Sequence, residues 1–132
     1  MTNNIRFVYM YRDASNYKQH GEVILPNETQ RTVEVVDTQI RSLLSDGLFF
    51  IARQVQVEER FFDVLHEDED HPWHEFAQVK ITTENCFNPE GIPERDITAF
   101  LAELEKAHSE GWNEMNVRDD MKRLMEKQKA RL

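Results

Sequence analysis

The chain is 132 residues long, which suits one domain, and with 39% apolar and 31% charged residues it is too apolar for a disordered chain and too charged for a membrane protein. Its 25 acidic residues against 16 basic ones give a formal charge of −9, which repels phosphate backbones and disfavours a nucleic-acid partner. No apolar run is long enough to span a bilayer, the N-terminus lacks signal-peptide features, and the single cysteine, Cys86, suits a reducing compartment, so we expect a cytoplasmic protein without membrane contact.

A hairpin is predicted at the start of the chain. Residues 5–12 carry apolar side chains at alternate positions, and their second face is also partly apolar, which favours a central strand. Residues 13–18 are rich in turn formers and lead into a second strand over residues 19–25.

The middle of the chain predicts one helix and two more strands. Residues 33–45 have apolar side chains at helical spacing, with Thr29 or Thr32 as the N-terminal cap. The aromatic and β-branched run at residues 49–57 predicts a third strand, and the alternation in residues 75–82 predicts a fourth. The apolar face of this fourth strand consists of Ala77, Val79 and Ile81.

The C-terminal part, residues 94–132, is predicted to be helical. One helix ends at Gly111, and Asn113 is suited to cap a second helix. The apolar stripe of this final helix consists of Val117, Met121, Leu124, Met125 and Leu132. Such a helix can pack on its own sheet, which we expect, or on a second protomer, which would make a homodimer.

These elements predict an α+β fold. It has a small antiparallel or mixed sheet of about four strands in the order ββαββαα, helices packed on one face, and a C-terminal two-helix tail. We expect a single domain over residues 1–132, in which residues 1–84 form the sheet with its crossing helix and residues 94–132 form the helical pair.

The acidic stretch at residues 61–76 is the first candidate site, because it combines three histidines with six carboxylates. Asp70, His71 and His74 are suitable ligands for a divalent metal such as zinc, manganese or iron. Their spacing matches no diagnostic motif, and Pro72 opposes the helix that would place both imidazoles on one face. The alternative is an exposed acidic loop in which His74 is hydrogen-bonded within the fold.

A second candidate is a polar contact surface shared by the first turn and the end of the acidic stretch. Such a surface would gather cations, carboxylates, an imidazole and an indole around one ligand. Its members are Arg12, Asp13, Asn16, Tyr17, Lys18, Trp73, His74 and Glu75. The alternative is that Arg12 and Lys18 only neutralise the acidic stretch while the other residues form the turn.

Three short motifs within this region also suggest a family. They are Tyr11-Arg12-Asp13, Asn16-Tyr17-Lys18 and Asp70-His71-x-Trp73-His74-Glu75. With these motifs the chain, from about residue 5 to residue 82, resembles a family of small uncharacterised bacterial proteins. The resemblance implies a bacterial cytosolic origin, and it implies neither a fold nor an activity.

We expect a non-enzymatic binding or regulatory module that contacts a protein partner, or a second copy of itself, and needs no cofactor. The alternative is a metal-dependent hydrolase that uses the His, Asp and Glu cluster at residues 66–75, with a divalent metal as its cofactor. An acidic surface that imitates DNA is a third hypothesis.

Overall fold

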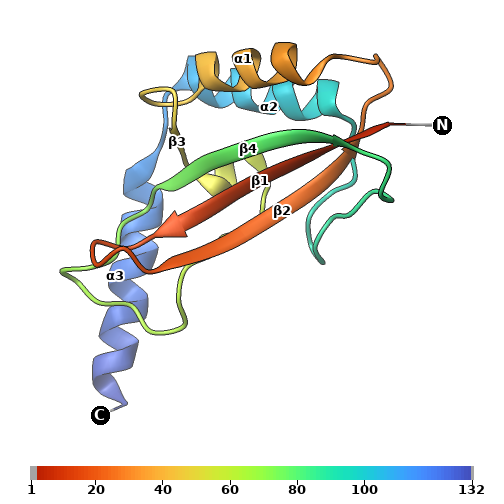
Figure 1. Ribbon diagram of the computed structural model, residues 1–132. Helices are drawn as coiled ribbons and strands as arrows, with labels where there is room; N and C mark the ends of the chain where they lie inside the picture. The colour runs from red at the N-terminus through yellow and green to blue at the C-terminus, as the bar shows by residue number, and fades with distance from the viewer. Residues whose placement is uncertain (1–2, 132) are drawn as a thin grey trace.

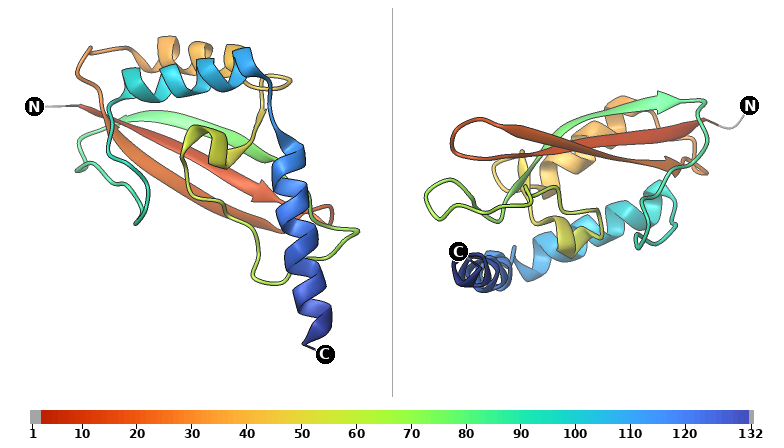
Figure 2. Two further views of the ribbon diagram at one scale, coloured as in Figure 1. Left: turned by 180° about the vertical axis from the view of Figure 1, so that it is seen from behind. Right: turned by 90° about the horizontal axis from the view of Figure 1, so that it is seen from below.

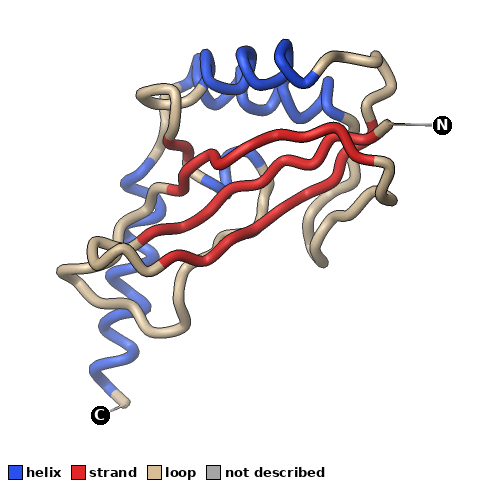
Figure 3. Tube along the Cα trace, in the orientation of Figure 1, coloured by secondary structure: helices blue, strands red, loops and turns tan. Residues whose placement is uncertain are grey.

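The computed structural model describes residues 3–131, which form a four-stranded antiparallel sheet with helices on one side (Figure 1). The elements are β1 (Asn4–Arg12), β2 (Lys18–Pro26), α1 (Val33–Leu43), β3 (Phe49–Phe50), the 3₁₀ helix η1 (Ala52–Val55), β4 (His74–Thr82), α2 (Ile97–Glu110) and α3 (Glu114–Ala130). The strands lie in the order β2-β1-β4-β3, and Figure 3 shows them as one curved layer. The predicted α+β class is confirmed. None of the helices among the described residues is both long and apolar enough to cross a bilayer.

β1 is the central strand. It pairs with β2 from Asn4↔Pro26 to Arg12↔Lys18, and it pairs with β4 on its other side. The inward side chains of β1 are Ile5, Phe7, Tyr9 and Tyr11, and all four are fully buried. Aromatic contacts between Phe7 and the rings of Phe76 in β4 and Phe100 in α2, at 5.5 and 4.9 Å between centroids, tie the sheet to the helices.

β4 contains a bulge that the sequence pattern did not reveal. Val8 lies opposite Gln78 while Tyr9 lies opposite Phe76, so Ala77 is an extra residue in β4. The extra residue places Phe76 and Val79 on the same face, where both are buried. The predicted apolar face is therefore wrong at Ala77, which Phe76 replaces, whereas Val79 and Ile81 lie opposite the inward residues Phe7 and Ile5, although Ile81 is 39% exposed.

The third strand is much shorter than the prediction of residues 49–57. Only Phe49 and Phe50 pair with β4. The chain then forms η1, which ends at Gln56, a residue in the left-handed conformation (φ 53°). The apolar side chains of this run are still buried, including Val55 and Val57. A short run of apolar residues can be buried either as a strand or as a tight helix, so the hydrophobic period does not distinguish these two structures.

The three α-helices begin at side chains that cap them. Thr32 accepts a hydrogen bond from the Val35 N–H at the start of α1, Asp96 caps α2, and Asn113 caps α3 as predicted. α1 and α2 lie side by side over the same face of the sheet (Figures 1 and 2). Their buried side chains belong to one core with those of β1, β2 and β4.

α3 packs on its own chain through its N-terminal half. Val117 and Met121 are buried against Ile51 and Leu65 in a second, smaller core. Further along the helix, the Gln128 side-chain amide both donates to and accepts from the Leu65 backbone, each at 2.9 Å. Leu124 of the predicted apolar stripe is 50% exposed, and Leu132 lies outside the described residues.

Gly21 in β2 lies beneath the ring of Tyr9, its partner in β1. A Cβ atom at position 21 would lie 2.5 Å from Tyr9 Cζ. The ring cannot move away at low cost, because it is fully buried and its hydroxyl donates a hydrogen bond to the Glu58 carbonyl.

We predict that Gly21→Ala lowers the free energy of unfolding by about 1–3 kcal/mol, the usual cost of overpacking a core. Urea denaturation of the variant and the wild type measures the difference. In a Tyr9→Leu background the same substitution should cost clearly less, because the clashing ring is absent. An equal cost in both backgrounds would contradict the assigned contact.

Candidate functional site

Two segments far apart in the sequence meet at one end of the sheet: the turn between β1 and β2, and the loop of residues 63–71, which we call the acidic loop (Figures 1 and 2). The Ala14 N–H donates to the Glu69 carbonyl at 2.9 Å. The Ser15 hydroxyl donates to the Glu69 carboxylate. The acidic loop is therefore docked on the turn by backbone and side-chain hydrogen bonds.

Tyr11, at the end of β1, holds the acidic loop against the sheet. Its buried hydroxyl donates to Asp70 Oδ1 and accepts a hydrogen bond from the His71 N–H at 3.3 Å. The second oxygen of Asp70 accepts from the His66 N–H at 2.7 Å. Burial and the neighbouring Asp70 carboxylate raise the pKa of Tyr11, so its hydroxyl stays protonated and remains a donor.

Three of the four ring nitrogens of the two candidate metal-binding histidines are hydrogen-bonded to the backbone, and the fourth, His74 Nδ1, is buried without a hydrogen-bond partner among residues 3–131. His71 Nδ1 accepts from the Trp73 N–H at 3.1 Å, which makes Nε2 the donor to the Arg12 carbonyl at 2.7 Å. His74 is fully buried, and its Nε2 accepts from the Arg60 N–H at 2.9 Å. Within residues 3–131, no group of three or more His, Cys, Asp or Glu side chains could hold a metal ion. The structure does not bring Asp70, His71 and His74 together as the predicted ligand set.

The predicted polar contact surface is brought together only in part. Arg12 Nε lies 2.9 Å from Glu75 Oε2, and its Nη1 donates to Asn16 Oδ1 at 2.7 Å. Arg12, Asn16 and Glu75 thus form one cluster that joins the turn to β4. In this cluster Arg12 neutralises one carboxylate of the stretch, as the alternative interpretation expected.

Trp73 and His74 lie elsewhere. The Trp73 indole N–H donates to Glu114 Oε2 at 3.2 Å, and its ring packs edge-on against Trp112, so Trp73 faces α3. His74 points into the core, where its ring lies 5.5 Å from that of Tyr11. These two side chains therefore do not join Arg12 and Glu75 on one surface.

A cavity of about 450 Å³ is lined by residues of both the turn and the acidic loop, and we call it the loop–turn cavity. It is lined by Asp13, Ser15, Tyr17, Lys18, Phe62, Val64, His66, Glu69 and Asp70. Asp13, Tyr17 and Lys18 belong to the predicted surface. Asp70 was predicted as a metal ligand, and His66 and Glu69 belong to the cluster at residues 66–75. Ser15, Phe62 and Val64 were given no role, although two apolar residues among so many carboxylates were a signal. Tyr17 is 69% exposed and Val64 is 56% exposed, so the cavity has an apolar rim.

The three carboxylates of the loop–turn cavity are held by uncharged donors. Asp13 Oδ1 accepts from the Tyr17 N–H at 2.9 Å, Glu69 accepts from a serine hydroxyl, and Asp70 accepts from a tyrosine hydroxyl and a backbone amide. Across residues 3–131, none of the three forms an ion pair. Their positions are therefore fixed without a direct ion pair, and Lys18 is a cation that lines the same cavity.

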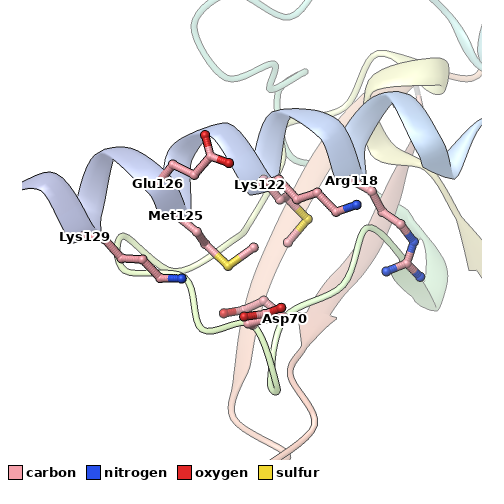
Figure 4. A pocket seen from close by; sticks show the side chains of 8 residues that line it. Asp70, Arg118, Lys122, Met125, Glu126 and Lys129 are labelled. Atoms are coloured by element: carbon pink, nitrogen blue, oxygen red, sulfur yellow. The ribbon is translucent and has the colours of Figure 1, made fainter.

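A second cavity, of about 400 Å³, lies on the other side of the acidic loop, between the loop and α3 (Figure 4). We call it the helix–loop cavity. It is lined by Glu67, Asp70, Arg118, Met121, Lys122, Met125, Glu126 and Lys129. In Figure 4, Lys129 and Met125 reach from α3 toward the loop that carries Asp70, whereas the carboxylate of Glu126 points away. Asp70 thus lines both cavities.

No protein-family model, curated protein or solved structure matches the chain. The chemical character of the loop–turn cavity comes from its own side chains. Exposed aromatic and aliphatic groups beside carboxylates attract a cation on an aliphatic stem, such as a lysine or arginine side chain. The serine hydroxyl of the cavity is engaged with Glu69 and has no histidine partner that would make it a nucleophile.

Burial of His74 makes the fold sensitive to acid. Burial lowers its pKa from 6.5 to about 3, and the Pro72 carbonyl offsets this only in part. The unfolded chain binds a proton at this residue near pH 6.5, whereas the folded chain binds it only near pH 3. Its contribution to stability is therefore complete above pH 6.5 and is lost as the pH falls toward 3.

We predict that His74→Gln, which keeps an acceptor for the Arg60 N–H, has a flatter stability profile than the wild type between about pH 6 and 4. The difference in slope should approach about 1.4 kcal/mol per pH unit, the value for one proton. Urea denaturation at several pH values measures it, and His108→Gln, an exposed site, should run parallel to the wild type. Parallel profiles for all three proteins would contradict the assignment.

Proposed function

We propose that the protein is a non-enzymatic binding module of the bacterial cytosol that recognises a basic segment of a protein partner through the loop–turn cavity. The observation that supports it is the set of three carboxylates, held by uncharged donors, beside the exposed side chains of Tyr17 and Val64. The bacterial cytosolic setting follows from the sequence resemblance and belongs to the same proposal.

Preorganisation favours such binding. An incoming ammonium or guanidinium group meets carboxylates that are already in position and has no intramolecular ion pair to displace, so little ordering is required on association. The aliphatic stem of the same side chain packs on Tyr17, Phe62 and Val64, and the ring faces add a cation–π attraction. The formal charge of −9 also accelerates the approach of a basic partner.

The alternative of a metal-dependent hydrolase has less support. Both nitrogens of His71 and Nε2 of His74 would have to release hydrogen bonds to the backbone before they could bind a metal, and His74 Nδ1 is buried. If His74 Nε2 bound a metal, the Arg60 N–H would also lose its hydrogen-bond acceptor. We therefore favour recognition over hydrolysis.

Hexalysine is a simple probe of the charged part of the cavity. We expect it to bind the wild type, with amide chemical-shift changes at Tyr17, Val64 and Glu69, while hexaglutamate does not. Asp13→Asn/Glu69→Gln keeps the hydrogen-bond acceptors but removes two charges, and should weaken binding roughly three- to tenfold.

The matched control is Glu105→Gln/Glu110→Gln, which removes the same charge from exposed positions of α2. Its affinity for hexalysine should stay within about twofold of the wild type, because distant surface charges are screened. Equal losses in the two double variants would mean that only net charge matters and would refute the site.

The aromatic part of the cavity is tested separately at Tyr17. We predict that Tyr17→Ser weakens hexalysine binding roughly two- to fivefold, the value of an exposed cation–π contact, whereas Tyr17→Phe, which keeps the ring, leaves it unchanged. Titrations followed by NMR measure both variants. A loss of binding in Tyr17→Phe as large as in Tyr17→Ser would exclude the ring face as the contact.

A further inference from the structure

The C-terminal half of α3 carries the opposite charge to the acidic loop. Residues 122–131 contain five basic residues and one acidic residue, Glu126. The basic residues are Lys122, Arg123, Lys127, Lys129 and Arg131. Of these, only Arg123 forms an ion pair among residues 3–131, with Asp120 of the same helix. This half of the helix therefore presents positive charge that its own chain leaves largely uncompensated.

These basic residues divide between two faces of the helix. Lys122 and Lys129 line the helix–loop cavity and face the acidic loop of their own chain. Arg123, Lys127 and Arg131 recur every four residues and form a separate stripe. Lys127 lines neither the helix–loop cavity nor a further cavity of about 710 Å³ between α3 and residues 63–69, whereas Arg131 lines that further cavity beside Glu67 and Glu69.

The stripe also offers apolar contact. Leu124, which follows Arg123, is half exposed although it belongs to the apolar face of the helix. Long basic side chains with an exposed leucine between them match the loop–turn cavity, whose rim combines Tyr17 and Val64 with carboxylates. The two surfaces are thus complementary in both charge and polarity.

Both surfaces lie at the same end of the molecule. The C-terminal half of α3 extends past the sheet at the end where the β1–β2 turn and the acidic loop lie, as Figure 1 and the left view of Figure 2 show. Two copies that meet end to end about a two-fold axis can therefore exchange these contacts reciprocally. A reciprocal exchange closes as a dimer instead of growing into a filament.

We propose that the basic segment recognised by the loop–turn cavity is the stripe Arg123, Lys127 and Arg131 of a second copy of this chain. This inference rests on the proposed function and identifies its partner. The second copy supplies ion-pair partners for Asp13, Glu69 and Asp70, which form no ion pair among residues 3–131 although Lys18 lines the same cavity. The formal charge of −9 opposes association at long range, but salt screens that repulsion beyond about 8 Å, whereas opposite charges in contact are screened less.

Charge reversal tests the proposal on the full chain by sedimentation equilibrium. The helix variant is Lys127→Glu/Arg131→Glu, and the loop variant is Asp13→Lys/Glu69→Lys, at two carboxylates that line the loop–turn cavity. We expect the wild type to form dimers and each variant alone to associate at least tenfold more weakly, because like charges then face each other. An equimolar mixture of the two variants should form a mixed dimer. In one of its two contacts the reversed helix attracts the reversed loop, and in the other the native helix meets the native loop.

A second measurement guards against variants that fail to fold. A synthetic peptide of residues 118–131 should bind the wild-type chain in competition with hexalysine, and the same peptide with the two helix substitutions should not. Circular dichroism and urea denaturation confirm that each full-length variant is folded before its mass is interpreted.

Three outcomes would overturn the proposal: a wild type that stays monomeric at its highest soluble concentration, dimers that persist in both variants, or a mixture that fails to associate. If hexalysine still binds in a manner that depends on Asp13 and Glu69, the basic-segment function stands and only the identity of the partner is wrong. If hexalysine also fails to bind, both proposals are wrong.

Discussion

The hydrogen bond from the Tyr11 hydroxyl to the Asp70 carboxylate is the contact on which the arrangement of this end of the protein depends. Tyr11 is at the end of the central strand and fully buried, so its hydroxyl requires a partner. Asp70 meets that requirement and is held in turn by the His66 N–H. The loop so anchored forms one wall of both cavities, so the proposed binding surface is a direct extension of the core.

A second consequence concerns charge. A carboxylate can be held in place by a cation or by neutral donors, and only the neutral donors leave its charge free to attract another molecule. Arg12 and Glu75 follow the first arrangement on the outer face of the sheet, and Asp70 follows the second beside Tyr11. Carboxylates so close together repel one another, so the acidic loop is costly to the isolated fold and gains from a cationic partner. This favours recognition as its role.

The candidate site shows why the local sequence predicted only some of the residues that come together. Asp13, Tyr17 and Lys18 do line a cavity with the acidic loop, because a turn and a charged loop at the same end of a sheet are both exposed. Trp73, His74 and Glu75 were expected on one surface, yet consecutive residues entering a strand point to alternate sides. Trp73 accordingly faces α3, and His74 lies in the core.

The sequence by itself, through hydrophobic periodicity and capping residues, determined the fold class, the central position of β1 and the approximate extent of α1 and α2. It also determined the cap of α3 at Asn113. These features depend on neighbours within a few residues along the chain. Tertiary structure alone decided the bulge at Ala77, the replacement of a long third strand by η1, and the hydrogen bonds of His71 Nε2 with the Arg12 carbonyl and of His74 Nε2 with the Arg60 N–H. Each of these satisfies a packing or hydrogen-bonding requirement imposed by residues distant in the chain, and no local pattern encodes such a requirement.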